Sequence, residues 1–443
     1  MNQKIKLKQT EIGEIPEDWN YDILSKHLYI KGRIGWKGLQ KSEYLTDGSG
    51  IVIINGTQIQ DNRLDWSDCG RVPEWRYDES PEIQLKENDI VMTKDGTIGK
   101  VAFIEKLPEK SSVASGIFVI RAKSGEIDQK FLFYFFKLPL FKWLIETRKE
   151  GSVIPHLYQR DFEELPFAYP NIQEQESIAK ILSAIDSKIE LNQQMNKTLE
   201  AIGQAIFKHW FIDFEFPNVE GKPYKSSGGE TIDSELGEIP KEWKIISFDE
   251  VADLIHGYQF RHYDFTNEGV KVFKITQIND NGEIDLSSCD FVDRKRLSKF
   301  ENIRIHSGDI LMALTGATIG KYARYYEPEE EILQNYRVGK FISKNDAILS
   351  QDYLYFLISS INFLNTILSK QTQSAQQNIG KAEINNTLIL LPPKKSMLQF
   401  SNIVSSYFKK IENNTHEFKT LIQIRDSLLP KLMSGKIRVP NEV

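Results

Sequence analysis

Apolar residues recur every three or four positions in two long stretches of the chain, residues 172–211 and 397–433. This spacing is typical of a helix with one apolar face. Because neither helix can bury that face alone, we predict that the two pack together as an antiparallel, coiled-coil-like pair, each roughly 60 Å long. The expected contact positions are Ile178, Ile185, Ile189, Asn192, Leu199 and Ile206 in the first helix, and Tyr407, Ile411, Asn414, Leu421 and Leu428 in the second.

Two of these positions are polar. The strings KIELN, ending at Asn192, and KIENN, ending at Asn414, align without a gap and place the two asparagines at the same point of the two apolar faces. A polar residue within an apolar helix interface can fix the register of the pair. The alternative is that both asparagines face solvent, and the sequence leaves the two possibilities open.

The helices close two copies of one larger unit, because other segments also recur in the same order. The paired segments are EIGEIPEDW (11–19) and ELGEIPKEW (235–243), NDIVMTKDGTIGK (88–100) and GDILMALTGATIGK (308–321), and QKFLFYFF (129–136) and QDYLYFLI (351–358). Within each copy, short strand-like runs alternate with turns and few helices. We therefore predict an α+β fold with two similar mixed globular domains, separated by the helix pair and related by an approximate two-fold axis.

The predicted boundaries follow from the repeats and from one stretch rich in Pro, Gly and Ser. They are 1–170 for the first globular domain, 171–214 for the first long helix, 215–234 for a connector, 235–393 for the second domain, 394–434 for the second long helix and 435–443 for a tail. The tail occupies the place where the connector begins in the first copy. We therefore expect the two ends of the chain to lie near each other.

The amino-acid composition indicates the broad class of protein but not its function. The chain has 443 residues, 40% hydrophobic and 27% charged, which is typical of a soluble globular protein of two or three domains. It has no signal-peptide core and no apolar run that spans a bilayer, so we expect a cytoplasmic protein with no membrane partner. Two cysteines are too few for a disulfide framework or a thiolate zinc site. A net charge of −6 does not favour nucleic-acid binding but is compatible with a local basic surface.

Catalytic motifs are absent from the sequence. The strings GTIGK (96–100) and GATIGK (316–321) have shorter spacing than a nucleotide-binding phosphate loop and lack its following Ser or Thr. A turn between two strands near DNA phosphate is the better interpretation, with Lys100 and Lys321 as candidate phosphate contacts. The chain also lacks HExxH, GxSxG and GxGxxG, and its histidines do not cluster at metal-ligand spacing. We expect no catalysis by this chain alone and no bound metal or cofactor.

Taken together, these segments resemble the specificity subunit of type I restriction-modification systems. The resemblance covers nearly the whole chain and includes LEAIGQAIFKHWFIDF (199–214) and SLLPKLMSGKI (427–437). It implies a non-catalytic subunit with two target recognition domains, each reading one half of a bipartite double-stranded DNA target, while the helices set the spacing. It also implies two modification (methyltransferase) subunits and ATP-dependent restriction (translocase/endonuclease) subunits as partners, which use S-adenosylmethionine, ATP and magnesium.

Two pairs of loops are candidates for reading DNA because each pair keeps its position in the repeat while its residues differ. Arg can pair with guanine, and Asn or Gln with adenine, in the major groove. The alternative is that these are ordinary solvated loop residues. The candidates are His156, Tyr158, Gln159 and Arg160 with Gln376, Gln377, Asn378 and Lys381 in one pair, and Arg33 and Lys37 with Tyr258, Gln259 and Arg261 in the other.

Two other function classes remain open at this level. A duplicated structural or adaptor protein that binds protein or glycan ligands would have the same repeats, and an NTP-dependent enzyme would use the glycine turns. Salt-sensitive, sequence-selective binding to duplex DNA distinguishes the recognition subunit from both.

Overall fold

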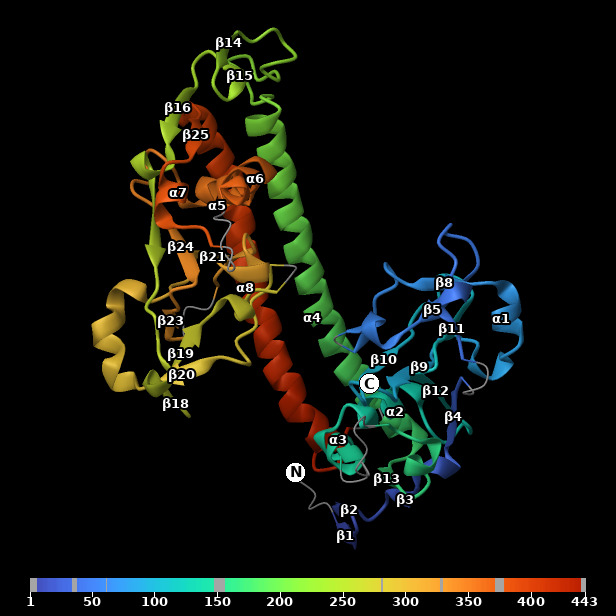
Figure 1. The fold of residues 1–443 in the computed structure, drawn as a ribbon. Coiled ribbons are helices and arrows are strands. Elements are labelled where there is room, and N and C mark those ends of the chain that lie inside the picture. Colours follow the sequence, from blue (N-terminus) through green and yellow to red (C-terminus); the bar gives the residue numbers. More distant parts are fainter. Residues whose placement is uncertain are drawn as a thin grey trace. The chain divides into compact units, whose positions relative to one another are not determined.

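The structure is a computed structural model that describes residues 6–33, 38–60, 62–146, 156–279, 282–326, 330–370 and 378–439. The chain divides into two compact units, Met1–Lys188 with Thr420–Val443, and Ile189–Lys419. Two long helices, α4 (Ile172–Phe207) and α8 (Lys394–Met433), each continue from one unit into the other (Figure 1). Each unit therefore consists of one globular domain and part of both helices.

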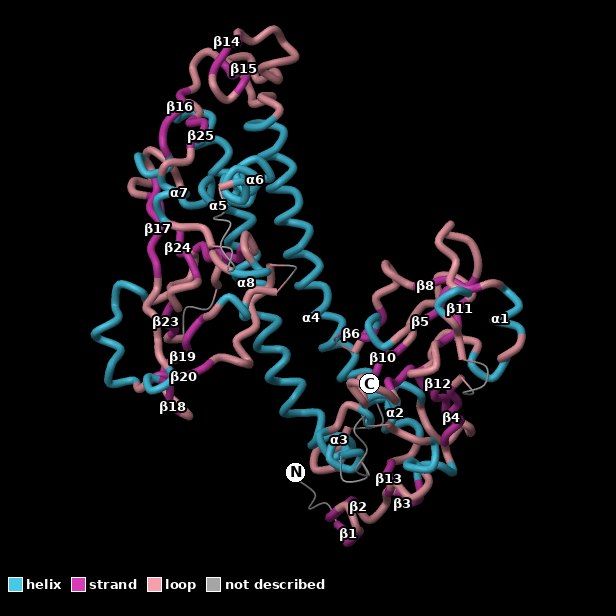
Figure 2. The backbone as a smooth tube through the Cα atoms, in the orientation of Figure 1, coloured by secondary structure: helices cyan, strands magenta, loops and turns pink. Residues whose placement is uncertain are grey.

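Strands and short helices alternate with long loops in both domains (Figure 2). In the first domain the elements are β1 (Leu7–Thr10), β2 (Gly13–Pro16), β3 (Asn20–Ile23), β4 (Leu28–Gly32), β5 (Ile51–Ile54), β6 (Ile59–Gln60), β7 (Arg63–Leu64), β8 (Gly70–Val72), α1 (Glu74–Asp78), β9 (Ile90–Thr93), β10 (Val101–Phe103), β11 (Ser111–Val113), β12 (Ile117–Ala122), α2 (Gln129–Phe136), α3 (Pro139–Glu146) and β13 (Pro166–Tyr169). In the second they are β14 (Thr231–Ser234), β15 (Gly237–Pro240), β16 (Lys244–Ser247), β17 (Ala252–His256), β18 (Phe265–Thr266), β19 (Val270–Phe273), β20 (Asp290–Val292), β21 (Ile310–Ala313), β22 (Tyr322–Arg324), β23 (Ile332–Gln334), β24 (Val338–Ser343), α5 (Gln351–Ser359), α6 (Ile361–Ser369), α7 (Lys381–Asn385) and β25 (Leu388–Leu391).

The sheet topology confirms the duplication. The first domain has a four-stranded sheet of order β10-β9-β12-β4, and the second has the corresponding order β22-β21-β24-β17. The order β11-β5-β8 is matched by β23-β19-β20, and in both cases the first two strands are parallel. The pairs β1-β2 and β13-β3 are matched by β14-β15 and β16-β25. The mixed α+β fold predicted from the repeats is therefore correct.

The aromatic helix of each domain is its packing centre. Phe131 in α2 and Tyr353 in α5 are buried, and each helix begins at a side-chain cap. The Asp128 carboxylate accepts a hydrogen bond from the Phe131 backbone N–H at 2.7 Å, and the Ser350 hydroxyl accepts one from the Tyr353 N–H at 3.1 Å. Such caps satisfy backbone donors that the first helical turn leaves unpaired. The two copies thus start the same helix in the same way.

The long helices pack antiparallel in both units. In the first unit Glu174 pairs with Arg438, just beyond α8, at 2.7 Å, and Asp186 with Arg425 at 2.9 Å. In the second unit the Asn192 side-chain N–H donates to Glu417 at 2.9 Å, and the Phe207 ring lies 5.7 Å from the Phe400 ring. In both units the partner's residue number falls as the number in α4 rises. The predicted antiparallel pairing is confirmed within each unit.

The predicted helix interface is confirmed at its polar positions. Asn192 and Asn414 are 1% and 0% exposed, so they lie inside the interface and do not face solvent. The Asn414 side-chain N–H donates to the side-chain oxygen Oδ1 of Asn196 at 2.9 Å. Ile178, Ile189 and Ile411 are buried, whereas six other predicted positions are only partly buried: Ile185, Leu199, Ile206, Tyr407, Leu421 and Leu428. The buried line of α8 passes instead through the neighbouring Phe408 and Leu429.

The C-terminal segment docks on the beginning of the first domain, as the repeat predicts. Gly435 lies so close to Pro16 that an added Cβ would be 2.3 Å from its ring. Arg438 makes an ion pair with Asp18 at 2.7 Å and another with Glu174. The hydrogen bond from Arg438 is the main cause that lowers the pKa of Asp18. The expected connector differs in one respect, because the second domain begins within it, at β14.

No helix in the described part of the chain is long and apolar enough to cross a bilayer. Within the same ranges, no group of three or more His, Cys, Asp and Glu side chains is placed to hold a metal ion.

Candidate nucleic-acid interface

In the first domain, one candidate loop is held against the turn that follows β9. The Leu157 side chain is buried, and its backbone N–H donates to the Lys94 carbonyl at 2.9 Å. His156 forms an isolated β-bridge with Asp95, and its imidazole pairs with the Asp95 carboxylate. These contacts fix the backbone of the loop, so the side chains that follow Leu157 project from a defined position.

The side chains that this loop presents form an exposed stack. Tyr158 is 49% exposed, and its ring lies 4.4 Å from the imidazole of His156 and 4.8 Å from the guanidinium of Arg160. Gln159 is also exposed. The face of an aromatic ring attracts a cation electrostatically, which holds the Arg160 guanidinium near the Tyr158 ring. The loop therefore presents an aromatic surface and a positive charge to solvent.

The second domain repeats the backbone of this loop with other side chains. Ile379 is buried, and its N–H donates to the Leu314 carbonyl at 3.0 Å. Asn378 forms an isolated β-bridge with Thr315, at the place where His156 pairs with Asp95 in the first domain. Asn378 and Lys381 are exposed, and the Lys381 ammonium makes a 2.7 Å ion pair with Asp253. The two domains thus carry different polar groups on one frame.

The second candidate loop of this domain is also anchored by its backbone. The Tyr258 N–H donates to the Gln334 carbonyl at 3.0 Å. The Tyr258 ring packs 4.9 Å from the ring of Phe300 and stays 43% exposed. Gln259 and Arg261 are exposed, and the Arg261 guanidinium donates to the Gln259 side-chain oxygen at 3.1 Å. These three side chains are accessible to a ligand, as the sequence predicts for a reading loop.

Arg33 is the predicted residue that the structure contradicts. Its side chain is 0% exposed and donates to the Val113 carbonyl at 3.1 Å, with Glu79 at 3.4 Å as its ion-pair partner. Burial lowers the pKa of this guanidinium, partly offset by Glu79. Arg33 is therefore buried against Val113 and Glu79 and is not accessible to DNA. Lys37, Gln376 and Gln377 lie outside the described residues.

Sequence reasoning missed three residues at this surface. Tyr336 and Arg337 lie between the two candidate loops, because the Tyr336 N–H donates to the Tyr258 carbonyl at 3.1 Å and the Arg337 carbonyl accepts from Leu314 at 3.0 Å. The Arg337 guanidinium donates to the Tyr336 hydroxyl at 2.9 Å. Ser115 and Gly116 hold these positions in the first domain. An aromatic and a basic residue in place of two small ones could have marked Tyr336 and Arg337 as candidates in the aligned copies.

The third missed residue is Lys94, beneath the loop of the first domain. Its ammonium lies 5.3 Å from the centre of the Phe118 ring, and burial lowers its pKa. Leu314 holds the equivalent position of the second domain. A lysine in place of a leucine in an otherwise apolar strand end was the signal in the sequence.

The two glycine turns connect antiparallel strands, β9 with β10 and β21 with β22. A phosphate loop instead connects a strand to a helix. The predicted turn between strands is confirmed. Lys100, at the end of the first turn, is exposed, and Lys321 in the second turn is partly buried.

Comparison with known proteins defines the class. A family model described as "Type I restriction modification DNA specificity domain" matches residues 35–201 and 240–423, so most of the chain is covered in two copies. The chain therefore belongs to the family of type I restriction-modification DNA specificity proteins.

Particular relatives match along their whole length. The chain is 28% identical over 444 residues to the type I restriction enzyme MjaVIII specificity subunit of Methanocaldococcus jannaschii, which covers 96% of this chain and 95% of that protein. It is 24% identical to the HindI specificity subunit of Haemophilus influenzae, with 87% and 94% covered. The fold is similar to the crystal structure of a type I S subunit from M. genitalium, with a TM-score of 0.55, 17% identity and coverage of 97% and 99%.

Proposed function

We propose that this chain is the DNA-recognition subunit of a type I restriction-modification enzyme and that each domain reads one half of a bipartite target. The observation that carries the proposal is the repeated loop frame. The bridges at His156 and Asn378 fix the same backbone in both domains, while the exposed groups beside them differ. One frame with two sets of side chains suits two different half-sequences. Membership of the specificity family supports the same assignment.

The chemistry of each loop fits a different base. The Arg160 guanidinium offers the paired donors that match the two major-groove acceptors of guanine. The Asn378 amide offers one donor and one acceptor, the pattern that matches adenine. Tyr158 adds a ring that packs on apolar base edges. Lys100 and Lys321 supply contacts to phosphate, which position the protein and carry little sequence information.

The long helices are the elements that set the spacing between the two half-sites in this proposal. With 36 and 40 residues, α4 and α8 span about 54 and 60 Å at 1.5 Å per residue. One turn of B-DNA is roughly 34–36 Å, so a helix of this length is on the scale of the distance between two major-groove sites. A flexible linker of the same residue count would not hold a fixed spacing.

The chemistry of modification and cleavage belongs to partner subunits. We assign methylation to two modification subunits that use S-adenosylmethionine, and cleavage to restriction subunits that use ATP and magnesium. The mixed-charge outer faces of the helices are the proposed docking surface for the modification subunits. Charge reversal of Lys188 and Lys410 weakens that complex if the placement is right, and an unchanged complex would contradict it.

Domain exchange tests the assignment of one domain to one half-site. Residues 11–170 are replaced by the recognition domain of another family member, and binding to target duplexes is measured with the modification subunit present at several salt concentrations. We expect only one half of the recognised sequence to change, with the salt-dependent phosphate contribution retained. A change in both halves, or binding that ignores sequence, would overturn the assignment.

A further inference from the structure

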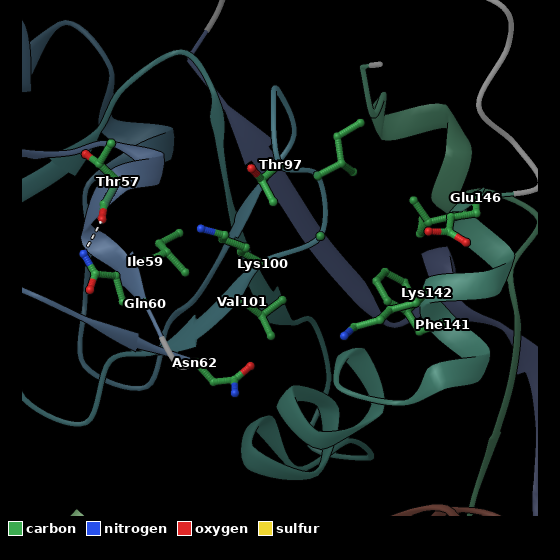
Figure 3. A pocket seen from close by; sticks show the side chains of 13 residues that line it. Thr57, Ile59, Gln60, Asn62, Thr97, Lys100, Val101, Phe141, Lys142 and Glu146 are labelled. Atoms are coloured by element: carbon green, nitrogen blue, oxygen red, sulfur yellow. Dashed lines mark hydrogen bonds between the residues drawn. The ribbon is translucent and has the colours of Figure 1, made fainter. Parts of the chain in front are cut away.

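The first domain contains a cavity of about 790 Å³ that is not lined by the candidate DNA-reading loop at residues 156–160. It lies among the β6–β7 hairpin, the glycine turn between β9 and β10, and helix α3 (Figure 3). Ile98 and Phe141 contribute to its apolar wall, and Lys100, Lys142 and Glu146 to its polar rim. Ligand pockets in proteins have volumes of roughly 300–1,000 Å³ with this mixture of apolar wall and few polar groups.

The duplication shows that the rim residues of α3 depart from the common pattern. Helix α6 is the counterpart of α3 in the second domain, and Phe363 is buried there as Phe141 is in α3. The two helices therefore share one register against the core. At that register, Lys142 and Glu146 of the first domain correspond to Leu364 and Leu368 of the second.

Those leucines lie close to the glycine turn of the second domain. A Cβ added to Gly320 would meet Leu364 and Leu368 at 3.8 Å, whereas a Cβ added to the equivalent Gly99 would meet nothing within 4 Å. Both leucines are partly buried and pack against the core of the second domain. The first domain thus has charged residues and open space beside its turn where the second has leucines.

The polar groups of the rim are available to a ligand. Among the described residues, neither Lys100 nor Lys142 has an ion-pair partner, and both side chains are exposed. Asn62 and Thr97 project from two further parts of the rim (Figure 3). The cavity therefore offers two cations, amide and hydroxyl groups and one carboxylate around an apolar wall.

We propose that this cavity binds one nucleotide, with its phosphate at Lys100 and Lys142 and its base against Ile98. Lysine ammonium groups bind phosphate oxygens as point charges. The Glu146 carboxylate repels a bare anion, but it accepts hydrogen bonds from the amino or ring N–H groups of a base. This combination favours a nucleotide over inorganic phosphate. The site is assigned to the first domain, because the second has Leu364 and Leu368 in place of the two charged rim residues.

The nucleotide is either part of the bound DNA or a free mononucleotide. Only the first source rests on the proposed function. A nucleotide of the bound DNA enters the cavity after extrusion, because a base stacked in the duplex is inaccessible. A free mononucleotide enters without DNA. Both present a base and a phosphate to the same residues, the phosphate being a diester in DNA and a monoester in the free nucleotide.

The test installs the residues of the second domain in the first. The double variant Lys142→Leu/Glu146→Leu copies a pair that already packs in the same fold, so it is expected to fold. The matched control is Trp143→Asn, which copies Asn365 at a position that is 58% exposed and outside the cavity. Lys100→Met is a second variant on another element. All are prepared as full-length chains in complex with the modification subunit.

Two measurements distinguish the sources. Calorimetric titration with each of the four deoxynucleoside monophosphates, with inorganic phosphate as comparison, tests the free ligand. Target duplexes carrying a fluorescent adenine analogue near the first half-site test extrusion. We expect binding or the fluorescence increase to fall about tenfold in Lys142→Leu/Glu146→Leu and in Lys100→Met, as loss of a charge-assisted hydrogen bond predicts, and to stay unchanged in Trp143→Asn.

Two results would overturn the proposal. One is a wild-type complex that shows neither nucleotide binding nor a fluorescence increase, and the other is an equal response from the double variant. If such a complex still binds its target selectively, the cavity assignment fails while the proposed function stands. A wild-type complex without any sequence selectivity would instead contradict the proposed function.

Discussion

The ion pair between Asp186 of α4 and Arg425 of α8 is expected to stabilise the first unit by an amount that can be estimated from its burial and partners. The Asp186 carboxylate accepts hydrogen bonds from the Tyr134 hydroxyl at 2.9 Å, the Lys137 ammonium at 3.0 Å and the Arg425 guanidinium at 2.9 Å. The side chains of Lys137, Asp186 and Arg425 are 8%, 21% and 18% exposed. Burial acts to raise the pKa of Asp186, but the charge of Lys137 and the hydrogen bond from Arg425 outweigh it and lower the pKa.

Replacing Arg425 by Leu leaves this carboxylate with one cation. Breaking a buried ion pair costs about 3–5 kcal/mol, and we expect about 2–3 kcal/mol because Asp186 keeps Lys137 and part of its hydration. For a unit of this size each kcal/mol lowers the melting temperature by about 2–4 °C, so the variant is expected to melt about 4–12 °C below the wild type.

Scanning calorimetry of the full chain measures this difference. Lys431→Leu, an exposed site on the same helix, is the control for loss of a positive charge and is expected to melt within about 1 °C of the wild type. In a double-mutant cycle, the loss in Asp186→Leu/Arg425→Leu should be smaller than the sum of the two single losses, with a coupling of about 1 kcal/mol or more. A melting temperature for Arg425→Leu equal to that of the control would show that the Asp186–Arg425 pair does not stabilise the first unit.

Three further predictions follow from single contacts. Gly203→Ala places a Cβ 2.4 Å from the Phe356 ring and should lower the free energy of unfolding of the second unit by about 1–3 kcal/mol, measured by denaturant unfolding. The control is Gly125→Ala, whose Cβ meets nothing within 4 Å, and its free energy of unfolding should change by no more than about 0.5 kcal/mol. Tyr158→Ala removes the ring between His156 and Arg160, and competition with duplexes altered in one half should show about tenfold weaker discrimination in one half-site and none lost in the other; equal losses in both halves would contradict the assignment. Because Arg438 lowers the folded-state pKa of Asp18 below its ordinary value of 3.8, the stabilisation is present above that value and lost as pH falls below it. Hydrogen exchange of residues 434–439, corrected for intrinsic rates, should therefore rise below about pH 4, and in Arg438→Gln it should be high at every pH.

The periodic features of the fold could be predicted from the sequence. Helix spacing and the repeated segments depend on neighbouring residues, and they indicated two similar domains and a paired helix interface. The sequence left open whether Asn192 and Asn414 face that interface or solvent, and their burial in the structure answers the question. The individual buried positions were less certain. Phe408 and Leu429 are buried where Tyr407 and Leu428 were expected to be, and a difference of one position is a rotation of about 100° around a helix. Phe408 packs on Tyr355 and Phe356 of α5.

The side-chain environments could not be predicted in the same way, because their partners are distant in the sequence. The buried Arg33 side chain donates to the carbonyl of Val113, 80 residues away in the sequence. Asp186 is paired with Arg425, 239 residues away. Nothing local distinguishes such an arginine from one that faces DNA. The cavity beside Lys142 had a signal in the aligned copies, where leucines replace charged residues, but the register of α3 and α6 was needed to interpret it.

A methylome shows whether the two domains read two halves of one DNA target. The chain is expressed with a modification subunit from its own locus in a methylation-free host, and modified bases are mapped by single-molecule sequencing. We expect a split motif, with two short specified halves around a gap of fixed length and one modified adenine in each half. A continuous motif, or an active methyltransferase in a stable complex that modifies no defined motif, would contradict it.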